Sequence, residues 1–326
     1  MDDHGIAATL AQQDGAISRR QLRSLGASPH DVQRLTRRRL LTRIHPGVYL
    51  EHTGPPSWRQ RAWAGVLALW PAALCAESAV YDEPATGDDG RPIHIAVARD
   101  RRVVTPHGVR VHRMAGLHER VWWNRCPPRV RYPDAVVDVA ARARSEFAAF
   151  EVLAQACRDR RTTPQRLADA LTQRSRVSRR AWLSAVLADL TAGTTSVLER
   201  GYVTAVEQAH GLPRAARQVR ATASLGVVYR DAEYAAGLLV ELDGRLVHNM
   251  VPQRDADLER DLDAALDGRT TVRLSWGQVF DRPCSTALKI ALLLRGRGWT
   301  EAPWPSGRSC PVGDAADLER SIRRTW

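Results

Sequence analysis

A short acidic pattern near residue 240 is the part of the sequence with the residue types for metal chemistry. The stretch GVVYRDAEYAAGLLVELDG contains two extended runs joined by the small-residue turn 235–237, which predicts a β-hairpin. Because side chains alternate along a strand, Glu241 and Asp243 point to the same face, about 7 Å apart along the strand. Asp231, late on the preceding strand, is close enough across the hairpin to join them.

Such a cluster predicts a divalent cation. Two neighbouring carboxylates in so apolar a strand are costly to bury unless a cation or hydrogen bonds compensate their charge. Mg²⁺, or Mn²⁺ in its place, takes oxygen ligands and binds through one or two carboxylates plus substrate phosphate. The chemistry of such a site is phosphodiester hydrolysis. The alternative is structural: Asp243 begins a strand-ending turn and Glu241 is a solvated edge residue.

The elements on either side of the hairpin supply further acids. A helix over 196–211 carries Glu199 on the same stripe as Tyr202, so its carboxylate could point inward across the sheet. Ser196 and Glu199 also match the S-x-x-E capping box, which would give Glu199 a local role. After the hairpin, the acids of a helix ending at Gly268 fit a solvated face, and its apolar residues are expected to be buried. These are Leu258, Leu262, Ala265 and Leu266.

A second signal is basic and lies near the N-terminus. Between Ser18 and Arg43 there are eight arginines and a single acid. Two helices are predicted, each begun by a capping serine, Ser18 and Ser28, and separated by a tight turn at Gly26. The outer face of the second helix could enter a DNA major groove. It carries His30, Gln33, Arg34, Arg37 and Arg38.

Two short extended runs around the turn 45–47 then have the form of a wing. Arg43 and His45 would lie near the DNA backbone. The ending Arg43, Gly47, Val48, Tyr49, after an arginine-rich helix, resembles the N-terminal winged helix of the AbiEi-type antitoxin family. The order and spacing of the segment that follows resemble the same family.

The C-terminal order of elements resembles the Vsr-like branch of the P-D-(D/E)-x-K endonuclease superfamily over about residues 196–299. The resemblance implies Asp231 and Glu241 as metal ligands, with Asp243 where the superfamily has a lysine. It also implies His248 as a proton-transfer residue. Asp257 and Asp261 would orient His248 or the metal from behind. The superfamily lysine is absent, since Lys289 is the only lysine in the chain and falls in a late apolar helix.

Composition sets the outer limits. The chain of 326 residues predicts two or three domains. We expect a winged helix-turn-helix at 1–55, an α+β connector at 56–192, and at 193–326 a restriction-endonuclease-like mixed sheet flanked by helices. The fold class is thus α+β or α/β and multidomain. The formal charge of +12 favours a polyanionic partner.

The sequence also predicts where the protein works. The longest apolar runs are too short to cross a bilayer, and the N-terminus has no secretory pattern, so we expect a cytoplasmic protein with no membrane contact. The cysteines are distant, odd in number and without a C-x-x-C pair, which argues against a disulfide framework and a structural zinc site. They are Cys75, Cys126, Cys157, Cys284 and Cys310.

These patterns favour a DNA endonuclease that docks on double-stranded DNA through the winged helix and cleaves with magnesium. The alternative is a transcriptional repressor or antitoxin, of a type IV toxin–antitoxin-like system, in which the nuclease fold has lost activity and serves binding or dimerisation. A cognate toxin and a homodimer then become candidate partners. The three acids favour the enzyme, whereas the missing lysine favours the repressor.

Overall fold

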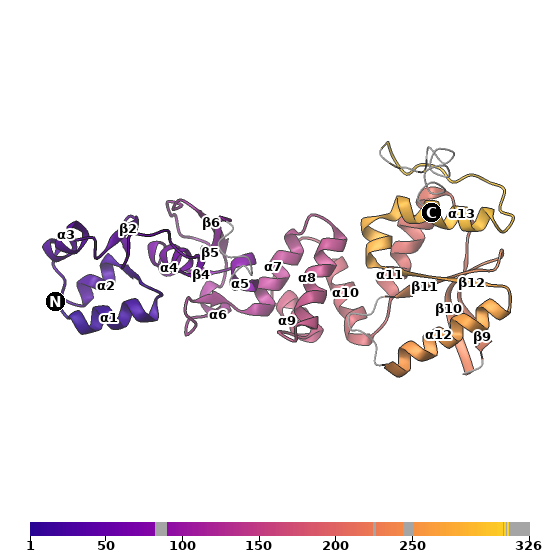
Figure 1. The fold of residues 1–326 in the computed structure, drawn as a ribbon, viewed down its shortest axis with the longest axis horizontal. Coiled ribbons are helices and arrows are strands. Elements are labelled where there is room, and N and C mark those ends of the chain that lie inside the picture. Colours follow the sequence, from indigo (N-terminus) through magenta and orange to yellow (C-terminus); the bar gives the residue numbers. More distant parts are fainter. Residues whose placement is uncertain (82–89, 224–225, 244–250, 309, 311, 313–326) are drawn as a thin grey trace. The chain divides into compact units, whose positions relative to one another are not determined.

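The computed structural model describes residues 1–81, 90–223, 226–243, 251–308, 310 and 312. The chain forms two compact units, Met1–Val139 and Ala140–Trp326 (Figure 1). Both units combine helices with β-sheet, two sheets in the first and one in the second, so the mixed α+β multidomain class predicted from the sequence is confirmed. Within the described part of the chain, no helix combines the length and apolarity needed to cross a membrane.

The first unit begins with three short helices and a three-stranded antiparallel sheet, an arrangement compatible with the predicted winged helix. β3 lies between β1 and β2, and β2 with β3 forms the predicted hairpin. β1 was not predicted, because it has three residues that are all buried and therefore shows no alternation. The elements are α1 (Asp3–Gln12), β1 (Ala16–Ser18), α2 (Arg19–Ser24), α3 (Pro29–Arg37), β2 (Thr42–His45) and β3 (Val48–Leu50).

Serine caps fix where α2 and α3 begin, as predicted. The hydroxyl oxygens of Ser18 and Ser28 accept from the backbone N–H groups of Gln21 and Asp31, at 3.3 and 3.2 Å. The side chains of Gln21 and Asp31 accept from the serine backbone N–H groups in return, which completes two capping boxes. Between the helices, Gly26 has a φ of +79°, a left-handed conformation that glycine adopts without strain.

The wing sheet shares a core with the helix that follows it, α4 (Trp58–Ala68). Val48 and Trp63 belong to one buried cluster. Asp14, just before the sheet, accepts from Trp63 Nε1 and from two guanidinium nitrogens of Arg59, each at 3.0 Å. The winged helix is therefore fastened to α4 by both apolar packing and a half-buried ion pair.

The rest of the first unit is a five-stranded sheet in the order β6-β5-β4-β8-β7. In this sheet β5 and β6 are parallel. The segment after Pro71 contains a short strand, β4, before the helix α5. The elements are β4 (Ala73–Leu74), α5 (Glu77–Val80), β5 (Ile93–Ala98), β6 (Val109–Met114), α6 (Leu117–Arg120), β7 (Val121–Trp122) and β8 (Arg129–Val130). α7 (Tyr132–Arg142) runs across the boundary between the units.

The second unit opens with helices that pack with the C-terminal elements through an aromatic cluster. Trp276 stacks on Phe150 with ring centroids 3.8 Å apart and on Phe280 at 5.1 Å, and Trp182 meets Trp276 and Phe280 edge-on. The division between the units consequently falls inside the segment 56–192 that the sequence suggested as a connector. The helices are α8 (Glu146–Arg158), α9 (Pro164–Thr172), α10 (Arg180–Ala192) and α11 (Ser196–Gly201), continued by η1 (Tyr202–Glu207) and η2 (Gln208–His210).

A four-stranded mixed sheet in the order β12-β11-β10-β9 follows. β9, β10 and β11 are antiparallel, whereas β11 and β12 are parallel and joined through α12. α11 and α13 lie on one side of the strands and α12 on the other (Figure 1). The elements are β9 (Ala216–Ala223), β10 (Gly226–Tyr234), β11 (Leu238–Asp243), α12 (Val251–Leu266), β12 (Thr270–Ser275), η3 (Gly277–Asp281) and α13 (Pro283–Arg295).

The orientation of α12 differs from the sequence prediction. Leu258, Leu262 and Leu266, expected in the core, are 56%, 60% and 87% exposed. Ala264 is the buried position, and Asp261 on the same face reaches Arg273 of β12. The face with the carboxylate lies toward the sheet because Arg273 supplies an ion partner there, and this turns the leucine stripe outward.

Removing the cap of α3 tests how that helix is held. Ser28→Ala should cost about 1 kcal/mol of local stability. Amide exchange in peptides covering 29–37 should therefore become about five-fold faster in hydrogen–deuterium exchange mass spectrometry. Ser24→Ala is the matched control, since the Ser24 hydroxyl donates to the carbonyl oxygen of Gln21 within α2. Equal exchange of α3 in the two variants would show that the cap is not what fixes the helix.

Candidate functional sites

The outer face of α3 presents the five residues of that helix that the sequence predicted to contact DNA. All five are exposed, whereas Val32 is buried and Leu35 packs against the N-terminal core. The exposed residues are His30, Gln33, Arg34, Arg37 and Arg38, together with Arg43 on β2.

A groove of about 420 Å³ runs beside this face and is lined by four arginines. Arg37 and Arg43 come from the predicted set, while Arg19 and Arg23 of α2 were not singled out. The sequence did contain a signal for them, because Arg19 and Arg23 are one helical turn apart on a helix capped by Ser18. Arg34 differs from the others because its guanidinium forms an ion pair with Asp31 at 2.8 Å, which offsets part of its charge.

The prediction for His45 is wrong. Its side chain is 8% exposed and therefore cannot lie on a DNA backbone. The register of the β2–β3 hairpin shifts between Arg43 and His45, and this irregularity turns His45 inward while Arg43 stays outside. Burial, and secondarily the nearby His107, lowers the pKa of His45.

In the second unit, β10 and β11 bring Asp231 and Glu241 together as predicted. The paired positions of the hairpin end with Ala232 opposite Val240, so Asp231 and Glu241 are the next residues across. Asp231 Oδ2 accepts the backbone N–H of Leu242 at 2.7 Å. At this position the hydrogen bond between the strands is thus made to the Asp231 side chain and not to a backbone carbonyl.

Burial raises the pKa of Asp231, and the neighbouring Glu199 carboxylate raises it further. The amide of Leu242, the Gln218 side chain and Arg273 act in the opposite direction without cancelling the shift. Glu199 therefore does face the hairpin. It also accepts the hydroxyl of Thr195 at 2.7 Å, and Thr195, not Ser196 as predicted, occupies the position before the helix.

Burial also raises the pKa of Glu241, with repulsion from Asp231 as the next cause. Arg230, itself 5% exposed, lies 3.4 Å from Glu241 Oε1 through its Nη1 and lowers the pKa, as does Arg273. The two carboxylates thus remain a repelling pair despite two arginines beside them. Carboxylates whose negative charge is only partly neutralised by neighbouring arginines are the oxygen ligands that a hard divalent cation prefers.

Arg273 is the residue of this cluster that the sequence did not reveal. It lies directly beside Glu241 in the parallel β11–β12 register. Asp261 of α12 accepts from Arg273 Nε at 3.2 Å and from Nη2 at 2.9 and 3.1 Å. Asp261, predicted to orient His248 or a metal, therefore fixes an arginine next to the acids. Parallel strands that are joined through a helix pair residues distant in the sequence, and no local pattern indicates which residues will pair.

The remaining predicted residues of this site are Asp243, His248 and Asp257. Asp243 ends β11 and is exposed, opposite Ser275. His248 and the side chain of Asp257 lie outside the described residues. In the described residues, the carboxylates of Glu199, Asp231 and Glu241 are not among the groups whose ligand atoms all lie within 4.8 Å of one another. The acidic cluster is therefore a pair, Asp231 and Glu241, with Glu199 within electrostatic range.

Comparison with known proteins bears on the first of these two sites. Residues 6–52 match the family described as "Transcriptional regulator, AbiEi antitoxin". The match runs from within α1 to just beyond β3 and so covers both the basic groove and the wing. No match is found among curated proteins. The N-terminal segment is thus similar to an antitoxin-type transcriptional regulator, which supports DNA binding.

The acid pair predicts a pH dependence of stability. A carboxyl group whose pKa is raised in the folded state stabilises the fold fully below its unfolded-state pKa, and this stabilisation is lost as pH rises through the folded-state pKa. Asp231→Asn keeps an oxygen for the Leu242 amide and removes the repulsion. The variant should therefore melt at a higher temperature than the wild type at pH 8, with the difference vanishing at pH 4. Asp267→Asn, at an exposed position, is the control and should melt at the wild-type temperature at both pH values. If Asp231→Asn also melted at the wild-type temperature at pH 8, the proposed repulsion would be contradicted.

Proposed function

We propose that the protein binds double-stranded DNA through its winged helix and is a Mg²⁺- or Mn²⁺-dependent DNA endonuclease whose site is the acid cluster of the second unit. The observation that carries the enzymatic part is the placement of Asp231 and Glu241 opposite each other at the end of a hairpin, both with raised pKa. The basic groove beside α3 carries the DNA-binding part.

The groove suits a duplex for two reasons. Its four arginines supply the positive charge that releases counterions from phosphates, and guanidinium groups form paired hydrogen bonds with phosphate oxygens. Gln33 and Arg37, exposed on α3, are residue types that read adenine and guanine edges in the major groove. The similarity of residues 6–52 to a transcriptional regulator supports the same use of this surface.

The acid cluster suits a hard cation. Asp231 and Glu241 would hold it, and Glu199 adds negative potential to the same place. When bound, Mg²⁺ would lower the pKa of a water ligand and stabilise charge on the phosphoryl oxygens. Arg273, held in place by Asp261, would place a positive charge beside the phosphate. Such a fixed positive charge is the feature that the missing lysine would otherwise provide.

The alternative is a repressor or antitoxin in which the second unit no longer cleaves. The family described for residues 6–52 favours it, as does the ion pair of Glu241 with the buried Arg230, which a metal would have to displace. In that case a cognate toxin and a second copy of the chain are the candidate partners. Duplex binding is common to both proposals, and metal-dependent cleavage distinguishes them.

Loss of groove arginines tests duplex binding. Arg37→Ala combined with Arg43→Ala should weaken binding and reduce the slope of log affinity against log salt by about 2 in fluorescence anisotropy. Arg166→Ala removes an exposed arginine from α9 and is the matched control. An unchanged salt slope in the double variant would remove the groove from the DNA interface.

Cleavage of supercoiled DNA tests the enzyme. With Mg²⁺ or Mn²⁺ the wild type should nick or linearise the plasmid, Asp231→Ala and Glu241→Ala should abolish cleavage, and Arg273→Ala should slow it about 100-fold. Glu233→Ala is the control, because Glu233 shares β10 but pairs with Arg269 at 3.5 Å. Cleavage that persists in Glu241→Ala would point to a contaminant. Metal-independent binding without cleavage across varied DNA would favour the repressor.

A further inference from the structure

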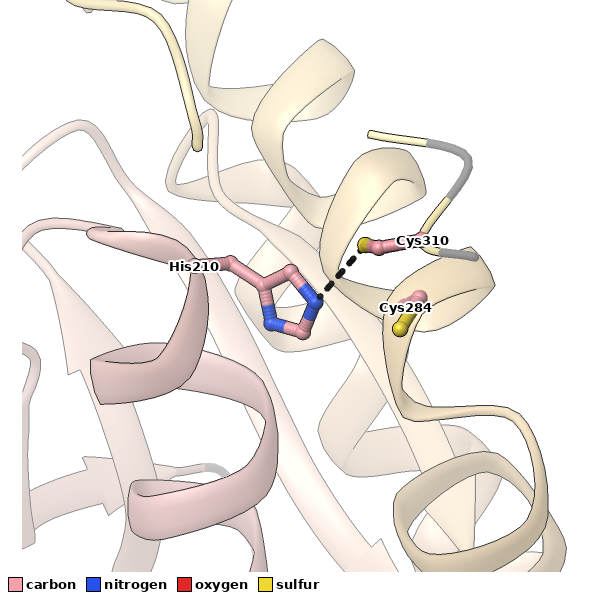
Figure 2. A group of neighbouring side chains, drawn as sticks. All are labelled: His210, Cys284 and Cys310. Atoms are coloured by element: carbon pink, nitrogen blue, oxygen red, sulfur yellow. Dashed lines mark hydrogen bonds between the residues drawn. The ribbon is translucent and has the colours of Figure 1, made fainter. Parts of the chain in front are cut away.

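Three side chains far apart in the sequence converge in the second unit. His210, Cys284 and Cys310 each direct one potential ligand atom to the same point, and these atoms all lie within 4.8 Å of one another (Figure 2). His210 ends η2, Cys284 lies in the first turn of α13, and Cys310 lies in the segment after that helix. One imidazole and two thiols form a typical ligand set for a transition metal.

The histidine is oriented as a metal ligand would be. His210 is fully buried, and its Nδ1 lies 3.0 Å from the carbonyl oxygen of Val206. An N–H at Nδ1 donating to that carbonyl leaves the Nε2 lone pair free to face Cys310, whose Sγ is 3.5 Å away. Metal-bound histidines are commonly fixed in this manner by a carbonyl on the opposite ring nitrogen.

The two cysteines come from separate segments that meet beside the histidine. Cys284 follows Pro283 at the start of α13, a helix of 13 residues whose N-terminal end stabilises the negative charge of a thiolate. Its Sγ lies 3.3 Å from the hydroxyl oxygen of Ser306, in the segment that leads to Cys310.

We propose that His210 Nε2, Cys284 Sγ and Cys310 Sγ bind one Zn²⁺ ion. A nitrogen at about 2.0 Å and a sulfur at about 2.3 Å from a tetrahedral zinc ion are separated by about 3.5 Å. The His210 Nε2–Cys310 Sγ distance of 3.5 Å matches this value. Three protein ligands leave the fourth position to water.

This metal would fasten the end of the chain to the helical layer. The backbone N–H of Trp304 donates to the carbonyl oxygen of His210 at 3.1 Å. The Trp304 ring also covers Gly211 so closely that a Cβ there would lie 2.6 Å from it. The segment carrying Cys310 is thus already directed over η2, and zinc would complete the attachment. The absence of a C-x-x-C pair does not exclude such a site, because its ligands are brought together by tertiary structure.

The zinc site is chemically distinct from the acid cluster and does not depend on the proposed nuclease. Thiolate and imidazole ligands select zinc, whereas paired carboxylates suit magnesium or manganese. The two sites share no residue, so either can be present without the other.

Metal content of the full-length protein tests the proposal. The wild type, purified without chelator under reducing conditions and reconstituted with Zn²⁺, should retain about one zinc ion per chain after desalting, measured by inductively coupled plasma mass spectrometry. Cys284→Ser and Cys310→Ser should lose that ion. Cys157→Ser, which replaces a half-buried cysteine outside the cluster, and Glu241→Ala should both keep it.

A spectroscopic measurement keeps the test decisive where a variant does not fold. Co²⁺ added to the metal-free wild type should produce thiolate-to-cobalt charge-transfer absorption and the intense visible bands of tetrahedral coordination. Zinc at wild-type stoichiometry in the Cys284→Ser/Cys310→Ser double variant would overturn the proposal. So would a wild type that shows no cobalt–thiolate absorption, or in which mass spectrometry finds Cys284 and Cys310 joined as a disulfide under the same reducing conditions.

Discussion

The burial of two neighbouring carboxylates, Asp231 and Glu241, is the constraint on which the candidate site of the second unit depends. Two half-buried carboxylates on facing strands oppose folding unless their surroundings hold them in place. The Leu242 amide ties Asp231 to the neighbouring strand, and Arg230 and Arg273 partly offset the charge of Glu241. The residual repulsion is a stability cost of the kind that proteins retain at functional sites.

The rest of the unit supplies the rigidity that this cost requires. A buried network joins the helical run to the sheet, with the hydroxyl groups of Tyr202 and Tyr234 2.8 Å apart and Glu207 accepting from both Tyr234 and Arg217. The aromatic cluster around Trp276 adds the helices of the preceding segment to the same body. A zinc ion at His210 would act on the same helical run from its far end.

The first unit depends on a different balance, in which positive charge is kept at the surface. Asp31 both caps α3 and pairs with Arg34, so one acid serves the fold and moderates the charge of the helix. Asp14, the other half-buried acid of residues 1–55, pairs with Arg59 of α4 and not with an arginine of the groove. The charge available to a polyanion is therefore concentrated beside α3.

Local features of the fold could be predicted from the sequence because neighbouring residues determine them. Serine caps, a glycine turn and the period of the apolar residues predicted α2, α3 and the β10–β11 hairpin, and strand alternation placed Asp231 beside Glu241. The basic face of α3 followed from the same helical period.

Contacts between distant residues were decided only by the tertiary structure. The parallel β11–β12 register, which sets Arg273 beside Glu241, the inward turn of His45 at a hairpin irregularity and the outward turn of the α12 leucines all depend on partners that no local pattern specifies. The meeting of His210 with Cys284 and Cys310 is of the same kind. Spacing along a chain reports on ligands within one element, whereas ligands from three elements become neighbours only when the chain is folded.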